Sequence, residues 1–182
     1  MHLIRRPRGI IVFNELIRYY TYYTMNEIGS EFGEFVEALV TASRALVAIA
    51  ARSLAGIEED VTLPQYRALI LVASRGPQSV ASLAHHLGVT PATATRMCDR
   101  LERKKLIERV QNPSDRRQVE VSLTTSAREL IATVTQRRRE EIEDLARTIN
   151  PEDRVVLIEA LRQLGAASGE PRDSQWSPEW NL

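Results

Sequence analysis

Apolar residues recur at helical spacing over most of the chain between residues 31 and 167. This period predicts a mainly helical protein. Four segments carry it most clearly: residues 31–54, 63–74, 125–149 and 151–165. The first segment has so wide an apolar stripe that a single neighbouring element cannot cover it.

Polar residues with capping chemistry precede these helices. Thr62 stands before the second segment and is a typical N-cap. The long third segment has three N-cap candidates, which are Thr124, Thr125 and Ser126. Ser126 is also spaced from Glu129 as in a capping box, in which each residue bonds the backbone of the other.

Two further helices are short and closely spaced. Ser79 can cap a helix that ends near Leu87, and Gly88 suits the left-handed position after a helix because it has no Cβ. Thr90 can then cap a second helix, which Pro91 begins. Two short helices joined by a three-residue turn that contains glycine make a helix-turn-helix.

The second short helix, residues 91–104, separates into two faces. Its apolar residues are expected to point inward; they are Ala94, Met97, Cys98 and Leu101. Its outward residues are hydroxyls and arginines, interrupted only by Asp99 and Glu102; they are Thr93, Thr95, Arg96, Arg100 and Arg103. Such a face suits a DNA major groove, because arginine can donate twice to guanine and threonine can touch a thymine methyl or a phosphate. An ordinary solvated face is the alternative.

A β-hairpin is predicted directly after this helix. Residues 106–111 form its first strand, the sequence NPSDRR over 112–117 forms its turn, and Val119, Val121 and Leu123 alternate with polar residues in its second strand. A helix-turn-helix followed by a hairpin is a winged helix. We therefore expect a mainly α fold with a small β-wing.

Charge is uneven along the chain although it is balanced overall. The 24 basic and 24 acidic residues give no sign of nucleic-acid or membrane binding by themselves. Residues 75–120 hold nine Lys and Arg against five Asp and Glu, a surplus of four positive charges. A local basic surplus is typical of nucleic-acid binding.

The remaining composition argues against other classes of function. The single cysteine allows no intramolecular disulfide and fits a cytoplasmic protein. Three histidines and one cysteine match no usual zinc spacing, and no stretch is long and apolar enough for a transmembrane helix. No acid pair, nucleophile–base set or phosphate-binding glycine loop occurs, so we expect no enzyme, no metal and no cofactor.

In their order and spacing, three segments make the chain similar to the MarR (multiple antibiotic resistance regulator) family of winged-helix transcription factors: LAHHLGVTPATATRMCDRLERK, SDRRQVEVSLT and LTTSA. The resemblance covers residues 32–166. It implies a homodimer that binds double-stranded DNA at a palindromic operator as a repressor. It also implies release by a small aromatic or anionic effector.

The resemblance implies DNA-binding roles for six residues, which are Thr93, Thr95, Arg96, Arg100, Asp115 and Arg117. Thr90 and Arg116 complete the expected set. Arg117 matches an arginine that enters the minor groove, Asp115 matches an aspartate that orders it, and Arg116 is expected to meet phosphate. A plain turn residue is the alternative for Asp115. The family usually has glycine where Lys105 stands, so Lys105 must adopt a left-handed conformation or shift the turn.

The expected organisation has five parts: an N-terminal arm 1–30, a dimerisation helix 31–60, a winged helix-turn-helix 61–124, C-terminal dimerisation helices 125–167 and a disordered tail 168–182. The helices outside the winged helix are apolar on broad faces, which a second chain in a two-fold dimer would cover. For residues 1–24, an extra arm and a start-codon artefact are both open.

An effector pocket is expected where the dimerisation helices meet the winged helix. Its candidate polar lining is Arg44, Arg52, Tyr66 and His86, and surface or interface positions are the alternative. Cys98 is expected to pack, with a redox-responsive role as the alternative. A winged helix that binds an acidic protein instead of DNA is the alternative function.

Overall fold

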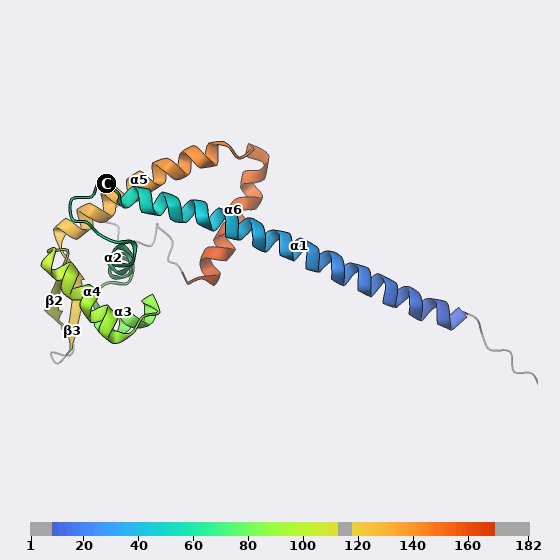
Figure 1. Cartoon of the computed structure of the whole chain (residues 1–182), viewed down its shortest axis with the longest axis horizontal. Helices are drawn as coiled ribbons and strands as arrows, with labels where there is room; N and C mark the ends of the chain where they lie inside the picture. The colour runs from blue at the N-terminus through green and yellow to red at the C-terminus, as the bar shows by residue number, and fades with distance from the viewer. Residues whose placement is uncertain (1–8, 113–117, 170–182) are drawn as a thin grey trace, which may run out of the picture. The chain divides into compact units, whose positions relative to one another are not determined.

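The computed structural model describes the backbone of residues 9–112 and 118–169, and the side chains from residue 29 onward within these ranges. In this part of the chain there are six helices and three strands (Figure 1). In order they are α1 (Gly9–Leu54), α2 (Leu63–Arg75), β1 (Gln78–Ser79), α3 (Val80–Leu87), α4 (Pro91–Arg103), β2 (Ile107–Gln111), β3 (Val119–Leu123), α5 (Thr125–Arg147) and α6 (Pro151–Ala167). The mainly helical fold with a small β-wing is confirmed.

Helix α1 starts much earlier than the sequence pattern predicted. The apolar stripe predicted a start at residue 31, whereas the helix begins at Gly9, so the predicted start is wrong. The helix continues through Gly29 and Gly33. Each glycine destabilises a helix by about 1 kcal/mol relative to alanine, which is too little to end it. None of the described residues of α1 is a proline.

By its internal contacts the chain divides near residue 47, within α1. The first unit, as far as it is described, is the helical segment 9–47. The second unit, residues 48–169 as described, contains the end of α1, the other helices and the sheet. Among the described residues no helix is both long enough and apolar enough to cross a membrane.

The sheet has three antiparallel strands in the order β1-β3-β2. Strands β2 and β3 form the predicted hairpin, with register from Ile107 opposite Leu123 to Gln111 opposite Val119. Strand β1 was not predicted; Gln78 lies opposite Val121 and Ser79 opposite Glu120. A two-residue strand has no alternation to detect, yet it ties the segment before α3 to the wing.

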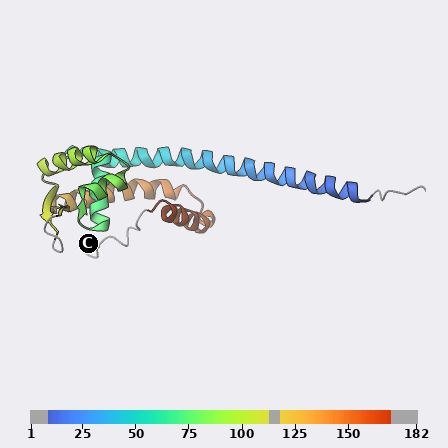
Figure 2. The ribbon, with the colours of Figure 1, turned by 90° about the horizontal axis from the view of Figure 1, so that it is seen from below.

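A single core holds the second unit together. Its fully buried large side chains come from α2 to α5, from strand β3 and from Leu106, the residue just before β2: Leu69, Leu83, Leu101, Leu106, Val121, Ile131 and Val134. Figure 2 shows α3, α4 and the hairpin at one end of this unit, with α5 leading away from them toward α6. The core therefore joins the helix-turn-helix and the wing in one packed unit.

Most predicted helix caps are present. The side chain of Thr62 accepts from the backbone N–H of Gln65, and the Gln65 side chain accepts from that of Thr62, so α2 has a complete capping box. Thr124 caps α5 and accepts from the N–H of Ala127. The capping box predicted for Ser126 and Glu129 is wrong because the helix begins at Thr125, which places both inside it.

Candidate nucleic-acid interface

The turn between α3 and α4 has the conformation that its residues favour. Ser79 caps α3, and Gly88 lies in the left-handed region at φ 64° and ψ 31°. Thr90 is extended at φ −70° and ψ 151°, and its side chain accepts from the N–H of Thr93 at 3.3 Å. Pro91 begins α4. The helix-turn-helix predicted from these residues is confirmed.

The inner face of α4 is anchored in the core. Ala94, Cys98 and Leu101 are each at most 2% exposed, and Met97 is half-buried. This is the i, i+4, i+7 spacing that one helical face presents. Because the inner face is buried to this extent, rotation of α4 about its axis would expose apolar side chains, so the direction of the opposite face is fixed.

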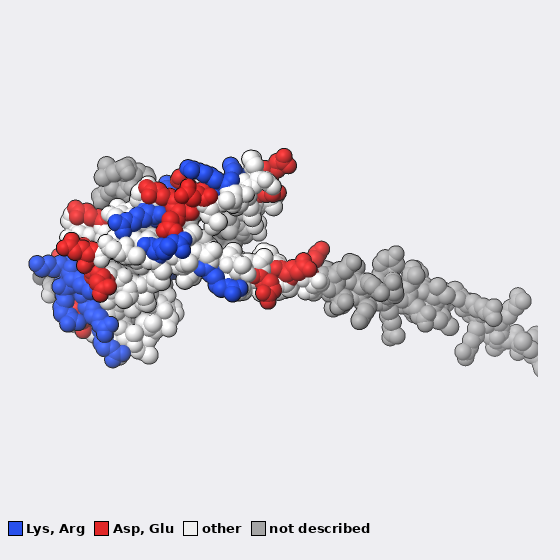
Figure 3. Space-filling model, turned by 45° about the horizontal axis from the view of Figure 1, so that its top comes forward, with Lys and Arg blue, Asp and Glu red and all other residues white. Residues whose placement is uncertain are grey.

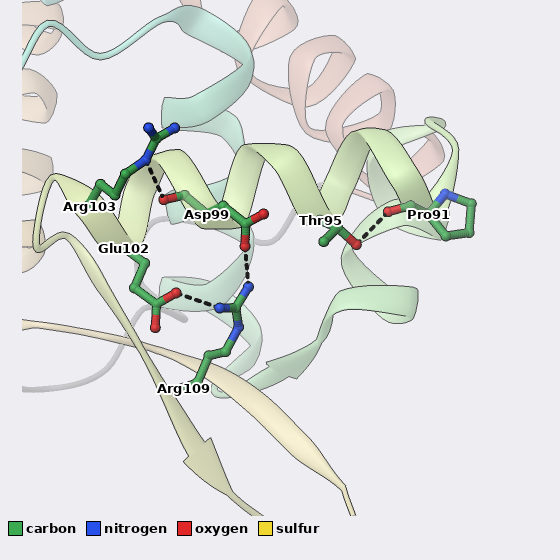
Figure 4. Close-up of polar contacts among 6 residues, drawn as sticks. All are labelled: Pro91, Thr95, Asp99, Glu102, Arg103 and Arg109. Carbon is green, nitrogen blue, oxygen red and sulfur yellow. Dashed lines mark hydrogen bonds and ion pairs between the residues drawn. The ribbon is translucent and has the colours of Figure 1, made fainter.

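The outer face of α4 is polar and basic. Thr93 is half-buried. The other outward residues of α4 are exposed; they are Thr95, Arg96, Arg100 and Arg103. Thr95 donates to the carbonyl of Pro91 at 2.9 Å (Figure 4). Figure 3 shows Lys and Arg side chains gathered on the part of the second unit that carries α4 and the hairpin. The local charge surplus seen in the sequence is therefore a surface feature.

The arginines of this face make weak local contacts that leave their charge available. Arg96 donates to Thr93 Oγ1 at 3.3 Å, and Arg103 Nε donates to the carbonyl of Asp99 at 3.3 Å. Neither partner carries a charge. An arginine held in this way is pre-oriented and can still pair with phosphate or a base edge.

The two acidic residues of α4 do not compete with this basic face, because β2 supplies them with a partner. Arg109 Nη2 lies 2.6 Å from Asp99 Oδ1, and Arg109 Nη1 lies 2.5 Å from Glu102 Oε2 (Figure 4). The hydrogen bond to Asp99 is the largest cause that raises the pKa of Arg109 above its usual value. The sequence pattern gave no sign of this contact, since it joins a helix to a strand.

The junction between α4 and the wing is built from two lysines. Lys105 stands in the left-handed region at φ 57°, so the first of the two outcomes expected for a lysine in place of glycine is observed. Its carbonyl accepts from Thr124 Oγ1 at 2.7 Å. Lys104 Nζ donates to the carbonyl of Glu59 at 2.7 Å and to that of Asp60. Both contacts stabilise the turn that starts β2.

Asn112 makes two contacts across the described part of the hairpin. Asn112 N donates to the carbonyl of Gln118 at 2.9 Å, and Asn112 Nδ2 donates to Glu120 Oε1 at 2.7 Å. The wing residues Asp115, Arg116 and Arg117 lie outside the described residues, so their roles stay predictions.

The candidate effector residues lie in different surroundings. Tyr66 is 3% exposed and its hydroxyl is 3.3 Å from Thr135 Oγ1. Arg52 pairs with Glu141 at 2.6 Å. The other two are exposed: His86 Nδ1 lies 2.8 Å from the carbonyl of Ser82, and Arg44 donates to Thr41 Oγ1 at 3.3 Å. Only Tyr66 is placed within the protein interior.

A residue missed by the sequence reasoning lies beside Tyr66. The guanidinium carbon of Arg138 is 5.4 Å from the centre of the Tyr66 ring, which is a cation–π distance. The Nε atom of Arg138 is buried without a hydrogen-bond partner among the described residues. Position 138 follows Ile131 and Val134 along the buried stripe of α5, which was the available signal.

One polar hollow is present elsewhere in the second unit. It has a volume of about 330 Å³ and is lined by the loop after α1 and the first turns of α5, including Glu58, Glu59, Glu129 and Arg137. None of the four candidate effector residues lines it. Among the described residues no group of three or more His, Cys, Asp or Glu is arranged to hold a metal ion.

Cys98 is a core residue of α4. It is 2% exposed, and burial is the largest cause that raises the pKa of its thiol, while Arg109 lowers it. A buried neutral thiol behaves as a small hydrophobic group and is a poor nucleophile. The packing role is therefore favoured over the redox alternative.

Comparisons with known proteins agree with this geometry. Residues 61–119 match the sequence profile of the MarR family. The crystal structure of RV1404 from Mycobacterium tuberculosis is 41% identical, with a TM-score of 0.71 over 76% of this chain and 95% of that one. The HTH-type transcriptional repressor MdtR of Bacillus subtilis is 39% identical over 67 residues, 37% of this chain and 43% of MdtR. The crystal structure of Streptococcus pneumoniae FabT in complex with DNA shares the fold, at 23% identity and a TM-score of 0.63 over 73% of this chain and 94% of FabT.

Proposed function

The chain belongs to the MarR family of winged-helix transcription regulators, and on this premise we propose that it is a dimeric repressor that binds a palindromic DNA operator. The observation that carries the proposal is the two-sided build of α4. Its inner face is buried in the core. Its outer face presents threonines and arginines beside a hairpin, and these arginines form no ion pair with another described residue. A basic helix fixed in this way is suited to a major groove.

Within this proposal the residues of α4 contact different parts of the DNA. Arg96 and Arg100 read base edges or hold phosphates, and Thr93 and Thr95 contact thymine methyls or phosphates near the start of the helix. Thr90 is the N-cap of α4, and its proposed role is to contact the DNA backbone at the helix start. Arg117, beyond the described part of the hairpin, enters the adjacent minor groove, Asp115 orders it, and Arg116 meets phosphate.

The proposal of a homodimer rests on helices that a single chain leaves uncovered. No residue of α6 is buried, although six large apolar side chains lie on it: Val155, Val156, Leu157, Ile158, Leu161 and Leu164. The described part of α1 also exposes Phe32 and Phe35, at 66% and 57%. Monomeric proteins rarely expose apolar surface of this extent. A second copy of the chain covers it and presents a second α4 to the other half of a palindrome.

The direction of regulation and the effector are proposed on narrower grounds. MdtR carries the name of a repressor, and a dimer bound over a promoter blocks it by occupancy alone. For an effector, the pair of Tyr66 and Arg138 offers an aromatic ring and the buried Nε–H of Arg138, which has no hydrogen-bond partner in the described part of the chain. A small aromatic or anionic molecule fits that chemistry. Arg52, which is paired with Glu141, and the exposed Arg44 and His86 are the weaker candidates.

DNA binding is tested by fluorescence anisotropy with duplexes from the region upstream of the gene. Wild-type protein is expected to bind one duplex far more tightly than a scrambled one, with an affinity that falls steeply as salt rises, because phosphate contacts release counterions. Arg100→Ala is expected to weaken binding by about 1–3 kcal/mol, and Arg117→Ala several-fold, both without loss of the dimer. Glu108→Gln on the exposed side of β2 serves as a control.

A different outcome would favour the alternative function. If the protein binds no upstream duplex even at low salt, and instead captures an acidic protein through the same arginines, the winged helix is a protein-binding module. Peroxide treatment of the wild type separates the redox alternative: unchanged operator binding eliminates a sensing role for Cys98.

A further inference from the structure

Arg109 joins the two elements that the proposed function assigns to DNA. It stands on β2, in the wing hairpin, and its two terminal nitrogens bind Asp99 and Glu102 of α4 at 2.6 and 2.5 Å (Figure 4). The recognition helix and the wing are thus connected by side chains as well as by the short turn between them.

The geometry of this contact restricts rotation as well as distance. Asp99 and Glu102 are three residues apart and so lie on one face of the helix. A guanidinium is a planar fork, and when both of its prongs are engaged its plane is fixed relative to both partners. Arg109 also lies opposite Val121, a buried residue of β3, so the strand that carries it cannot twist independently.

Stability alone does not account for this cluster. The side chains of Arg109, Asp99 and Glu102 are 34%, 48% and 39% exposed, and ion pairs with this much exposure contribute little to folding. Two carboxylates on a helix that faces DNA also repel phosphates. The cluster therefore adds little to folding stability, and its two carboxylates weaken the positive potential of the DNA-facing surface. Another role is needed to explain it.

We propose that Arg109 is a positioning residue for sequence-specific binding. By gripping Asp99 and Glu102 together, it sets the angle between α4 and the wing, so that the helix and the hairpin tip reach adjacent grooves of one duplex. Asp99 and Glu102 are the points by which the helix is held. The inference rests on the proposed DNA-binding function and adds the source of its specificity.

A simple electrostatic account predicts the opposite result, which makes the inference testable. Removing both carboxylates with the double variant Asp99→Asn/Glu102→Gln adds two units of positive charge to the DNA-facing surface. If charge alone matters, every duplex is bound more tightly. If Arg109 sets the angle, scrambled DNA is bound as tightly as before or more tightly, while the operator loses affinity.

The measurement is the dissociation constant for a scrambled duplex divided by that for an operator duplex of equal length, at one salt concentration. We expect the double variant to lower this ratio by about tenfold or more, the loss that one or two mismatched base pairs cause. Arg109→Lys keeps the charge but lacks the fork, and it is expected to lower the ratio as well. Glu108→Gln, which removes a carboxylate from the same strand without touching Arg109, should leave the ratio unchanged.

A footprint separates positioning from general damage. In both variants we expect guanine N7 in the major groove to stay protected from dimethyl sulfate and hydroxyl-radical protection of the flanking minor groove to weaken. The thermal unfolding midpoint should stay close to that of the wild type. An unchanged ratio in both variants overturns the inference. A wild-type protein that does not distinguish operator from scrambled DNA overturns the proposed function instead.

Discussion

Helices α4 and α6 differ in what the single chain does for them. Helix α4 has 13 residues and buries Ala94, Cys98 and Leu101, whereas α6 has 17 residues and buries none. Both sequences contain apolar residues at helical spacing. Helix α4 buries its apolar residues within the chain and presents a polar outer face. Helix α6 buries none and exposes apolar residues to water.

This contrast separates two kinds of partner. A buried inner face fixes the direction of the polar face of α4, which is what recognition of a rigid polar duplex requires. An unburied apolar helix gains most from another apolar surface, and a second copy of the chain always provides one. The same helical spacing of apolar residues therefore occurs in a helix that packs within its own chain and in a helix that does not. The burial of the apolar residues distinguishes the two.

The largest expected effect comes from placing charge on the uncovered helix. The double variant Ile158→Asp/Leu161→Asp should convert the proposed dimer to a monomer, because two carboxylates per chain would have to be desolvated at its interface. Loss of the second DNA-reading unit should then weaken operator binding by about 100-fold or more. Light scattering after gel filtration and anisotropy measure the two effects.

The matched control for this helix is Gln163→Asp, which adds a charge to α6 at an exposed polar position. It should leave both the dimer and the operator affinity unchanged. A dimer that survives the double variant would show that α6 is covered by something other than a second chain.

The second effect separates the two faces of α4. Leu101→Ala leaves a cavity in the core, where Leu101 is 1% exposed, and should lower the free energy of unfolding by about 2–5 kcal/mol. Arg96→Ala, on the exposed face of the same helix, should change it by less than about 0.5 kcal/mol and weaken DNA binding instead. Urea unfolding of both variants measures the free energy of unfolding, and fluorescence anisotropy measures DNA affinity. Destabilisation of the fold by Arg96→Ala with unchanged DNA binding would contradict the assignment of the two faces.

The smallest effect concerns Cys98. Because burial raises its pKa, the folded protein holds the thiol proton at pH values where an unfolded chain would release it. Alkylation by iodoacetamide at mildly alkaline pH should therefore be much slower in the native protein than in urea. As pH rises through the raised pKa, the small stabilisation from the neutral thiol is lost. Equal labelling rates in native and unfolded protein would contradict the packing role.

Local chemistry carried most of what the sequence predicted. Thr62, Ser79 and Thr90 cap the helices they were expected to cap, and Gly88 takes the left-handed conformation, because each depends on neighbours within a few residues. The helical spacing of its apolar residues predicted the inner face of α4. The hairpin that follows the helix-turn-helix then predicted a winged helix.

The features that the sequence did not predict depend on tertiary contacts or on competing local signals. The pairing of Arg109 with Asp99 and Glu102 joins residues on a helix and a strand, and no periodicity marks it. Strand β1 exists only because β3 lies beside it. For α5, several adjacent hydroxyl residues could serve as the cap, and the position of Thr124 against Lys105 decided among them.

The most direct test of the account is a hydroxyl-radical footprint of the wild-type protein on its upstream DNA. A dimer that places two copies of α4 in a palindrome should protect two sites on one face of the duplex, roughly 34 Å or one helical turn apart. Protection of the flanking minor grooves should accompany them. A single protected site, two sites on opposite faces, or no protection at low salt would contradict the proposal that this winged helix reads DNA as a two-fold dimer.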